Sequence, residues 1–327
     1  LMKHIAKLKK RPKYAFWKQV GSQAIQDIVD RIDKAYKLFF RNLEHGIKTA
    51  PPGFRKVKKY KSFTLKQAGW ELLDSNKIRI GKHIYKFVKS RDIVGTIKTV
   101  TIKRNSKGEF CLYFSVIHEQ PQVIATTGKI AGFDFGLKTF LMCSDGTEIE
   151  SPQFLKQALN QLRKAQQQLS RKKKGSSRYR AWLYVVANLH EQVVNKRRDW
   201  FFKLAHELTS KFDYLFFETL NIKAMQRLWG RKITDLAFAE FIQILKYVAQ
   251  QKGVIIHFVD RFFPSSKTCN CCGYINNELK LSGRHWRCNG CGNHNNRDHN
   301  AALNIECEGA SSLGLGNVRQ GSPAIAA

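Results

Sequence analysis

Apolar residues recur at helical spacing in several stretches of the chain. In residues 23–42 they lie three or four positions apart, which predicts an amphipathic helix with Ser22 as its N-cap and its apolar stripe in a core. Residues 153–211 predict two helices joined by a basic turn, because the pattern breaks near residues 171–177. Shorter helices are predicted at residues 233–251 and 298–307.

Short runs rich in β-branched and aromatic residues fill the region that follows the first helix. They lie at residues 62–65, 77–80, 83–87, 95–104 and 110–118. Turn-forming residues 105–108 separate the last two runs, which predicts a hairpin. Strands this short suggest a small β-barrel that carries Lys and Arg on its outer face. That basic face either contacts phosphates or is simply solvated, and the pattern fits both.

Three later strands are almost wholly apolar, which is typical of a buried sheet. They are expected at residues 129–138, 214–218 and 254–259, with a less apolar strand within residues 139–150. A single carboxylate interrupts the first of them and another ends the second. An acidic group in such a position is costly to bury, so both positions are candidates for chemistry.

The charge of the chain is unusual for a compact protein. Lys and Arg number 57 against 25 acidic residues, a net charge of +32. Nucleic acid is the expected partner because its phosphates neutralise such an excess, although a ribosomal or chromatin-type protein or a very soluble enzyme would also fit. Residues 1–127 hold 28 basic and 9 acidic residues (+19), and residues 128–327 hold 29 and 16 (+13). The first part is therefore expected to grip nucleic acid.

The sequence predicts a cytoplasmic protein. It contains no run of 18 apolar residues to span a membrane, and its start leads directly into basic sequence rather than a signal peptide. Eight cysteines in a reducing compartment favour metal binding over disulfides.

Four of the cysteines form two CxxC pairs, Cys269 with Cys272 and Cys288 with Cys291. Thiolates at this spacing surround one Zn²⁺ tetrahedrally and leave no open coordination position. The sequence therefore predicts a structural zinc ribbon at about residues 262–296. Cys271 lies inside the first pair and could compete as a ligand, but the spacing favours Cys272.

Three acidic residues, Asp134, Glu218 and Asp298, are candidates for a second metal site. Each has an ordinary explanation alone: Asp134 could pair with a lysine, Glu218 could mark the exit of a strand, and Asp298 could cap a helix. Together they could bind two Mg²⁺ or Mn²⁺ ions about 4 Å apart and hydrolyse a phosphodiester.

Three segments resemble the RuvC motifs of the TnpB (OrfB-type) family. They are residues 132–138 (GFDFGLK), residues 217–222 (FETLNI), and the zinc ribbon followed by residues 297–305 (RDHNAALNI). Their order, with the ribbon between the second and third motifs, is specific to that family. The similarity covers about residues 55–306.

The resemblance implies a transposon-encoded, RNA-guided DNA endonuclease related to small type V CRISPR effectors. Its partners would be a guide RNA and double-stranded target DNA, with sequence choice made by base pairing. Its catalytic and Mg²⁺-binding residues would be Asp134, Glu218 and Asp298. The implied fold is an α/β RNase H-like (RuvC) core with an inserted zinc ribbon, preceded by a helical segment and a small wedge-like β-barrel.

The implied domains are a partial helical recognition lobe at 1–50, the wedge at 51–127, the nuclease at 128–308 and a disordered tail at 309–327. Compared with the family, we expect the first wedge strand and part of the recognition lobe to be missing. In addition, Asn296 stands where many relatives have an acidic residue.

Two other functions fit the same motifs. A catalytically silent, RNA-guided DNA-binding protein would act as a repressor, but the complete set of three carboxylates argues against it. A transposase would need an end-binding motif, and none is evident in the sequence.

Further basic residues are candidates for nucleic-acid contacts, and each could equally be a solvated polar turn. They are Lys267 beside the first CxxC pair and, at the basic helical turn, Arg171, Lys172, Lys173 and Lys174.

Overall fold

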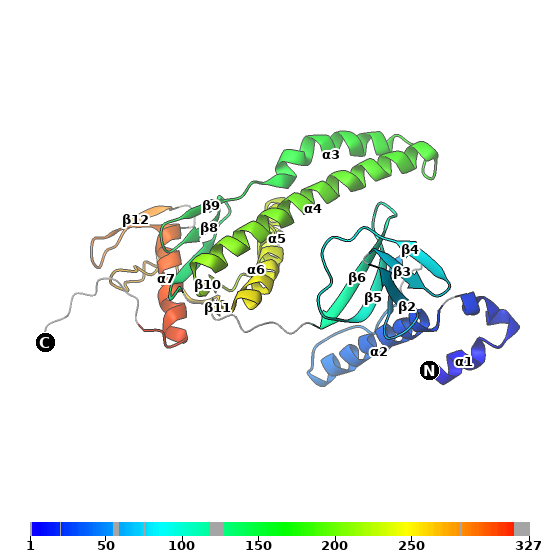
Figure 1. Cartoon of the computed structure of the whole chain (residues 1–327). Coiled ribbons are helices and arrows are strands. Elements are labelled where there is room, and N and C mark those ends of the chain that lie inside the picture. The colour runs from blue at the N-terminus through cyan, green and yellow to red at the C-terminus, as the bar shows by residue number, and fades with distance from the viewer. Residues whose placement is uncertain are drawn as a thin grey trace. The chain divides into compact units, whose positions relative to one another are not determined.

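The chain has a mixed α/β fold that divides into two compact units, residues 1–120 and 121–327 (Figure 1). The computed structural model describes residues 2–19, 21–54, 59–74, 76–117, 127–280 and 283–316. Each unit is considered by itself.

The first unit combines helices with two small antiparallel sheets. Its elements are α1 (Met2–Leu8), the 3-10 helix η1 (Pro12–Gln19), α2 (Ser22–Glu44), β1 (Ser62–Leu65), β2 (Trp70–Asp74), β3 (Lys77–Ile80), β4 (His83–Lys86), β5 (Thr96–Arg104) and β6 (Phe110–Ile117). The sheets have the orders β1-β5-β6 and β2-β3-β4. The hairpin expected around residues 105–108 is confirmed as β5–β6.

The predicted β-barrel is wrong for the part of the first unit that the structure describes. No backbone ladder joins one three-stranded sheet to the other, so the two sheets do not close into a ring. They share a small apolar core instead, centred on Leu65, Ile78, Val100 and Ile102. Closure of a barrel requires each strand to tilt and to pair, with a stagger, with a strand on either side. Strands β1 to β4 have only four or five residues, which is too short for such pairing on both sides.

Helix α2 confirms the predicted amphipathic helix but corrects two details. Its N-cap is Gly21, with no side-chain hydrogen bond, and Ser22 is already helical. The helix is tied to β1 through Asp27, which accepts a hydrogen bond from the Thr64 backbone N–H at 3.0 Å. Its apolar stripe is not wholly in a core.

The second half of the α2 stripe is exposed, with Ile32 at 43%, Tyr36 at 41% and Phe40 at 55% of full exposure. A helix of 23 residues is about 34 Å long, whereas the four residues of β1 cover about 13 Å. The short sheet therefore covers only the beginning of the helix.

The second unit is built on one five-stranded sheet. Its elements are β7 (Ile130–Phe135), β8 (Thr139–Cys143), β9 (Glu148–Glu150), α3 (Phe154–Ser170), α4 (Ser177–Lys211), β10 (Tyr214–Glu218), α5 (Ile222–Leu236), α6 (Phe238–Lys252), β11 (Ile255–Val259), β12 (His285–Arg287), β13 (His294–Asn296) and α7 (Arg297–Ser312). The strand order is β11-β10-β7-β8-β9. Strands β7, β10 and β11 are parallel, and β8 and β9 are antiparallel to their neighbours.

The two faces of this sheet are covered by different helices. Phe133 and Phe217 belong to the large core that includes buried residues of α4 and α6. Alternate residues point to the opposite face, where Phe216 packs with Ile305 and Ala310 of α7. Helix α7 therefore covers the second face alone among the described helices (Figure 1).

Gly132 allows α7 to approach β7 closely. A Cβ atom there would lie 2.2 Å from the backbone oxygen of Ala302 and 2.5 Å from the backbone nitrogen of Glu306. Gly132→Ala is therefore expected to lower the free energy of unfolding of this unit by about 3 kcal/mol or more, because two backbones must separate. Chemical denaturation would measure it.

The matched control is Gly21→Ala, since nothing lies within 4 Å of the added methyl there. Equal stability of the two variants would contradict the close approach.

Two helix boundaries differ from the sequence prediction. The helix expected at 233–251 is two helices, α5 and α6, because Ala237 between them is left-handed with φ of 47°. Helix α7 continues to Ser312, past the expected start of the tail at residue 309. Gly309 is a packing residue, since a Cβ atom there would lie 2.2 Å from the ring of Phe216. Residues 317–327 lie outside the described part.

The described helices include none with the length and apolar character that crossing a lipid bilayer requires.

Candidate active site and metal centre

The register of two parallel strands brings Asp134 and Glu218 together. In the β7–β10 ladder, Phe133 pairs with Phe217. The next residue of each strand, Asp134 and Glu218, therefore points to the opposite face of the sheet, toward α7. Both carboxylates lie at the carboxyl ends of their strands.

Helix α7 contributes Asp298 from its first turn. The helix crosses β7 with Ala302 opposite Gly132, so Asp298, about one turn earlier, lies toward Asp134. Asn296 caps the helix, its Oδ1 accepting the backbone N–H groups of Asp298 at 3.0 Å and of His299 at 3.2 Å. This cap holds the start of the helix, and with it Asp298, in place.

The negative charges of Glu218 and Asp298 both act on Asp134. The pKa of Asp134 is raised well above its usual value, first by burial and then by the negative charges of Glu218 and Asp298. Burial also raises the pKa of Glu218. Carboxylates gathered in this way need a positive partner to remain ionised.

Arg284 supplies one such positive partner. Its Nη1 donates to Asp298 Oδ1 at 2.7 Å and also contacts Oδ2. The sequence interpretation did not single out Arg284, because a lone arginine 14 residues before Asp298 follows no local pattern. It enters the site only because the segment before β12 folds back beside the start of α7, where Arg297 N–H donates to Arg284 O at 2.7 Å.

The four cysteines of the CxxC pairs meet and can hold a metal ion. The sulfur atoms of Cys269, Cys272, Cys288 and Cys291 all lie within 4.8 Å of one another. Between the two knuckles, the Sγ atoms of Cys269 and Cys291 are 3.8 Å apart and those of Cys272 and Cys288 are 3.5 Å apart. Thiolates about 2.3 Å from a tetrahedral ion are about 3.8 Å apart, so the cluster has suitable dimensions.

Buried asparagines attach this cysteine centre to α7. Asn300 and Asn304 each donate to the backbone oxygen of Thr268, at 2.7 and 2.6 Å. In return, the backbone N–H of Asn270 donates to Asn300 Oδ1 at 2.9 Å. The first knuckle is therefore fixed to the helix that carries Asp298.

The basic candidates lie in two separate segments of the second unit. Lys267 donates from Nζ to the backbone oxygen of Asn277 at 3.5 Å, within the segment of the first knuckle. Residues 171–174 form the turn between α3 and α4, at the end of that helical hairpin away from the sheet (Figure 1).

Two family models match successive parts of the chain. Residues 113–228 match the OrfB family described as "Probable transposase", and residues 238–305 match the "Cas12f1-like, TNB domain" family. The first match contains Asp134 and Glu218, and the second contains the four-cysteine centre and Asp298. The order of the matched segments is that of the motifs in the sequence. The chain is similar to the TnpB family over these segments.

Relatives of this chain carry names that refer to guided DNA cleavage. A protein of Streptomyces pristinaespiralis named "Putative RNA-guided DNA endonuclease" is 31% identical over 67% of this chain and 54% of its own length. A similarly named Escherichia coli protein, InsQ, is 26% identical over 94% of this chain and 79% of its own length. The chain thus spans about half the length of the first relative and more of the second.

A solved structure has the same fold. The chain resembles the protein in the cryo-EM structure of a Cas12f1–sgRNA–target DNA complex, with a TM-score of 0.57 and 18% identity. The likeness covers 87% of this chain and 71% of that chain.

Proposed function

We propose that this protein is an RNA-guided DNA endonuclease that hydrolyses target DNA with metal ions bound by Asp134, Glu218 and Asp298. The observation that carries the proposal is the position of these three carboxylates, from two parallel strands and a helix start, on one face of the sheet, where the charges of Glu218 and Asp298 act on Asp134. The names of the relatives agree with it.

The topology of the second unit supports an RNase H-like nuclease core. Strands β7, β8 and β9 follow one another as antiparallel neighbours, and β10 and β11 then add in parallel on the other side of β7. The strand at the centre of this sheet carries Asp134. Such a core would place the reaction at the carboxyl ends of β7 and β10.

The site suits a hard divalent cation, Mg²⁺ or Mn²⁺. Carboxylate oxygens are the donors that such ions prefer, and a cation would offset the burial and the neighbouring negative charges that raise the pKa of Asp134. When bound, the ions would activate the attacking water and neutralise charge on the phosphate. The chain's own residues hold the ligands in place: the β7–β10 ladder aligns two carboxylates, and Asn296 fixes the third.

Zn²⁺ is the proposed occupant of the four-cysteine centre, in a structural role. Four thiolates would fill a tetrahedral ion and leave no position for a substrate. Since Asn300 and Asn304 attach the first knuckle to α7, the ribbon would stabilise the helix that presents Asp298.

The first unit is proposed to bind the guide RNA and DNA, as a recognition lobe (1–50) and a wedge-like domain (51–127). It holds the larger part of the net charge. The lining of a cavity of about 1080 Å³ within it includes the cations of Lys18, Lys61, Lys82 and Arg104 and the rings of Tyr60 and Phe110, besides apolar side chains. Phosphates and unstacked bases bind such combinations of cations and rings.

The experiment that tests the proposal is sequencing of the RNA that copurifies with the protein, followed by cleavage of DNA matching that RNA. One enriched RNA species with a variable end, and Mg²⁺-dependent cutting of matched DNA only, are expected. Heterogeneous RNA and cleavage that does not depend on a match would contradict guided activity.

Arg284→Ala is expected to reduce DNA cleavage at saturating Mg²⁺ by about 10- to 100-fold, the usual effect of losing a partner of a metal ligand. The reason is that Arg284 orients Asp298 through contacts with both carboxylate oxygens. Arg284→Lys keeps the charge without the planar fork and should recover part of the rate. Equal cleavage by the alanine variant and the unaltered protein would exclude this role.

A further inference from the structure

Ser144 lies in the tight turn between β8 and β9, and it is buried although it belongs to a turn. Backbone hydrogen bonds close this turn, from Cys143 N–H to Thr147 O at 2.9 Å and from Gly146 N–H to Cys143 O at 3.0 Å. A buried hydroxyl is expected to have hydrogen-bond partners. The partners of Ser144 belong to two other elements, β7 and α7.

The contact of Ser144 with β7 is a pair of hydrogen bonds to Gly132. The Ser144 N–H donates to Gly132 O at 2.9 Å, and the Ser144 Oγ accepts the Gly132 N–H at 3.0 Å. The two residues are therefore opposite each other, one position beyond the paired Phe133 and Cys143 of the β7–β8 ladder. Side chains at opposite positions point to the same face, and so does Asp134, two residues after Gly132. Ser144 and Asp134 thus share the face that α7 covers.

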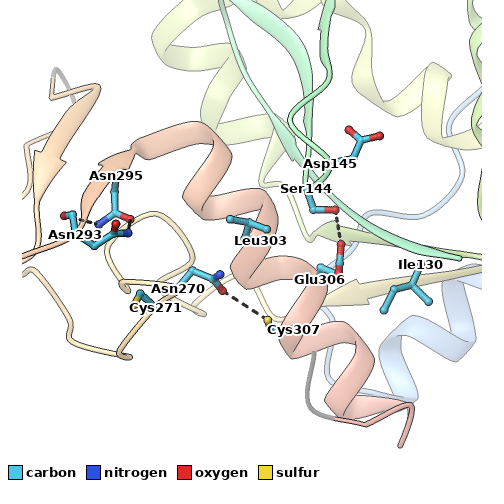
Figure 2. Close-up of a pocket in the computed structure, with 10 residues that line it drawn as sticks. All are labelled: Ile130, Ser144, Asp145, Asn270, Cys271, Asn293, Asn295, Leu303, Glu306 and Cys307. Atoms are coloured by element: carbon cyan, nitrogen blue, oxygen red, sulfur yellow. Dashed lines mark hydrogen bonds between the residues drawn. The ribbon is translucent and has the colours of Figure 1, made fainter. Parts of the chain in front are cut away.

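Ser144 contacts α7 at two points. Its Oγ donates to Glu306 Oε2 (Figure 2), and its backbone oxygen accepts a hydrogen bond from His299 Nε2 at 3.0 Å. His299 directly follows Asp298, and the two contacts lie on either side of Ala302, where the helix crosses β7. They are two helical turns apart, about 10 Å along the axis. Contacts on both sides of a crossing hold a helix against sliding and against rotation.

We propose that Ser144 is a positioning residue that sets the spacing between Asp134 on β7 and Asp298 on α7. The inference rests on the proposed function, in which both carboxylates bind the same pair of ions. Ligands of a two-metal site must suit ions about 4 Å apart, so a ligand on a helix has to be held in register with a ligand on a strand. Ser144 touches neither carboxylate, and it acts by fixing the elements that carry them.

Mn²⁺ binding to the full chain, followed by the electron paramagnetic resonance signal of free Mn²⁺, tests the inference together with DNA cleavage. Ser144→Ala keeps the backbone hydrogen bonds of the turn and loses both contacts of the hydroxyl. Mn²⁺ binding should weaken by about 10-fold, the lower end of the usual effect of losing a residue that orients metal ligands. The Mn²⁺ concentration for half-maximal cleavage should rise in parallel. Unchanged Mn²⁺ binding and cleavage in Ser144→Ala would overturn the inference.

Two variants of Glu306 separate the loss of a hydrogen bond from the loss of a charge. Glu306→Ala removes the acceptor that the Ser144 hydroxyl uses on α7, and it should weaken Mn²⁺ binding as Ser144→Ala does. Glu306→Gln keeps an oxygen that accepts from the hydroxyl and should bind Mn²⁺ nearly as well as the unaltered protein. Equal weakening by the two variants would mean that the charge matters and not the contact, which contradicts a positioning role for Ser144.

Thr209→Ala is the control for a general loss of stability. Thr209 is buried in α4, and its hydroxyl donates to Ala205 O of the same helix at 2.7 Å. Its loss should lower the melting temperature and leave the Mn²⁺ affinity unchanged. The same loss of affinity as in Ser144→Ala would show that instability alone explains both. Mn²⁺ binding and DNA cleavage that survive Asp134→Asn would instead contradict the proposed function itself, and the inference with it.

Discussion

Replacing Asp134 with asparagine is expected to abolish Mg²⁺-dependent DNA cleavage while leaving the bound RNA unchanged. Asp134 is on the central strand of the sheet, beside Glu218, and faces α7. The amide keeps the size of the side chain but cannot offer a charged oxygen to a cation. Losing a residue that orients a metal ligand lowers activity by up to about 100-fold. Asp134 is itself a proposed ligand, so the cleavage rate of the variant should fall by more than that.

The matched control is Glu148→Gln, which removes an exposed carboxylate from β9 of the same sheet and should cut DNA normally. Glu218→Gln and Asp298→Asn should behave like the Asp134 variant. Cleavage by Asp134→Asn at the unaltered rate would remove Asp134 from the site. An unaltered protein that binds RNA and matched DNA but never cuts would favour the repressor-like alternative.

Cys269→Ser is expected to release the metal and unfold the ribbon. Cys269 is fully buried, and among the described residues the small core around it has Trp286 and Cys288 as its other buried members. A core of this size cannot stabilise the segment alone, and structural zinc contributes about 10 kcal/mol or more in comparable small domains. Zinc content should fall to zero, and the second unit should melt at a lower temperature.

Because Thr268 is held by Asn300 and Asn304, loss of the ribbon should also disturb the start of α7 and reduce DNA cleavage. Cys111→Ser, on β6 of the first unit, is the control and should retain metal and stability. A Cys269→Ser protein with full zinc content would show that the four thiolates do not act as one site.

The sequence alone predicted the strands and knuckles that hold the candidate site residues, because their signals are local. An apolar strand interrupted by Asp134, another ended by Glu218, and two CxxC pairs are each contained in a few neighbouring residues. The structure places strands and knuckles at these positions. Strand β2 was missed, since Trp70–Asp74 lies among turn-forming residues that hide a five-residue strand.

The tertiary structure alone decided which distant residues meet. The pairing of Phe133 with Phe217, which puts two carboxylates side by side, is a property of the ladder and not of either strand. The contact of Arg284 with Asp298 depends on how the ribbon folds back onto α7. No local pattern encodes such contacts.

The same reason explains the predictions that failed. Whether short strands close into a barrel depends on the tilt and length of all of them together. Whether the apolar stripe of α2 is covered depends on the length of the strand against which it packs. Local sequence determines helices, strands and metal-binding spacings through neighbouring residues. Whether a sheet closes into a barrel, whether an apolar helix face is covered, and which charged residues meet all depend on packing across the whole unit. That packing exists only in the folded chain.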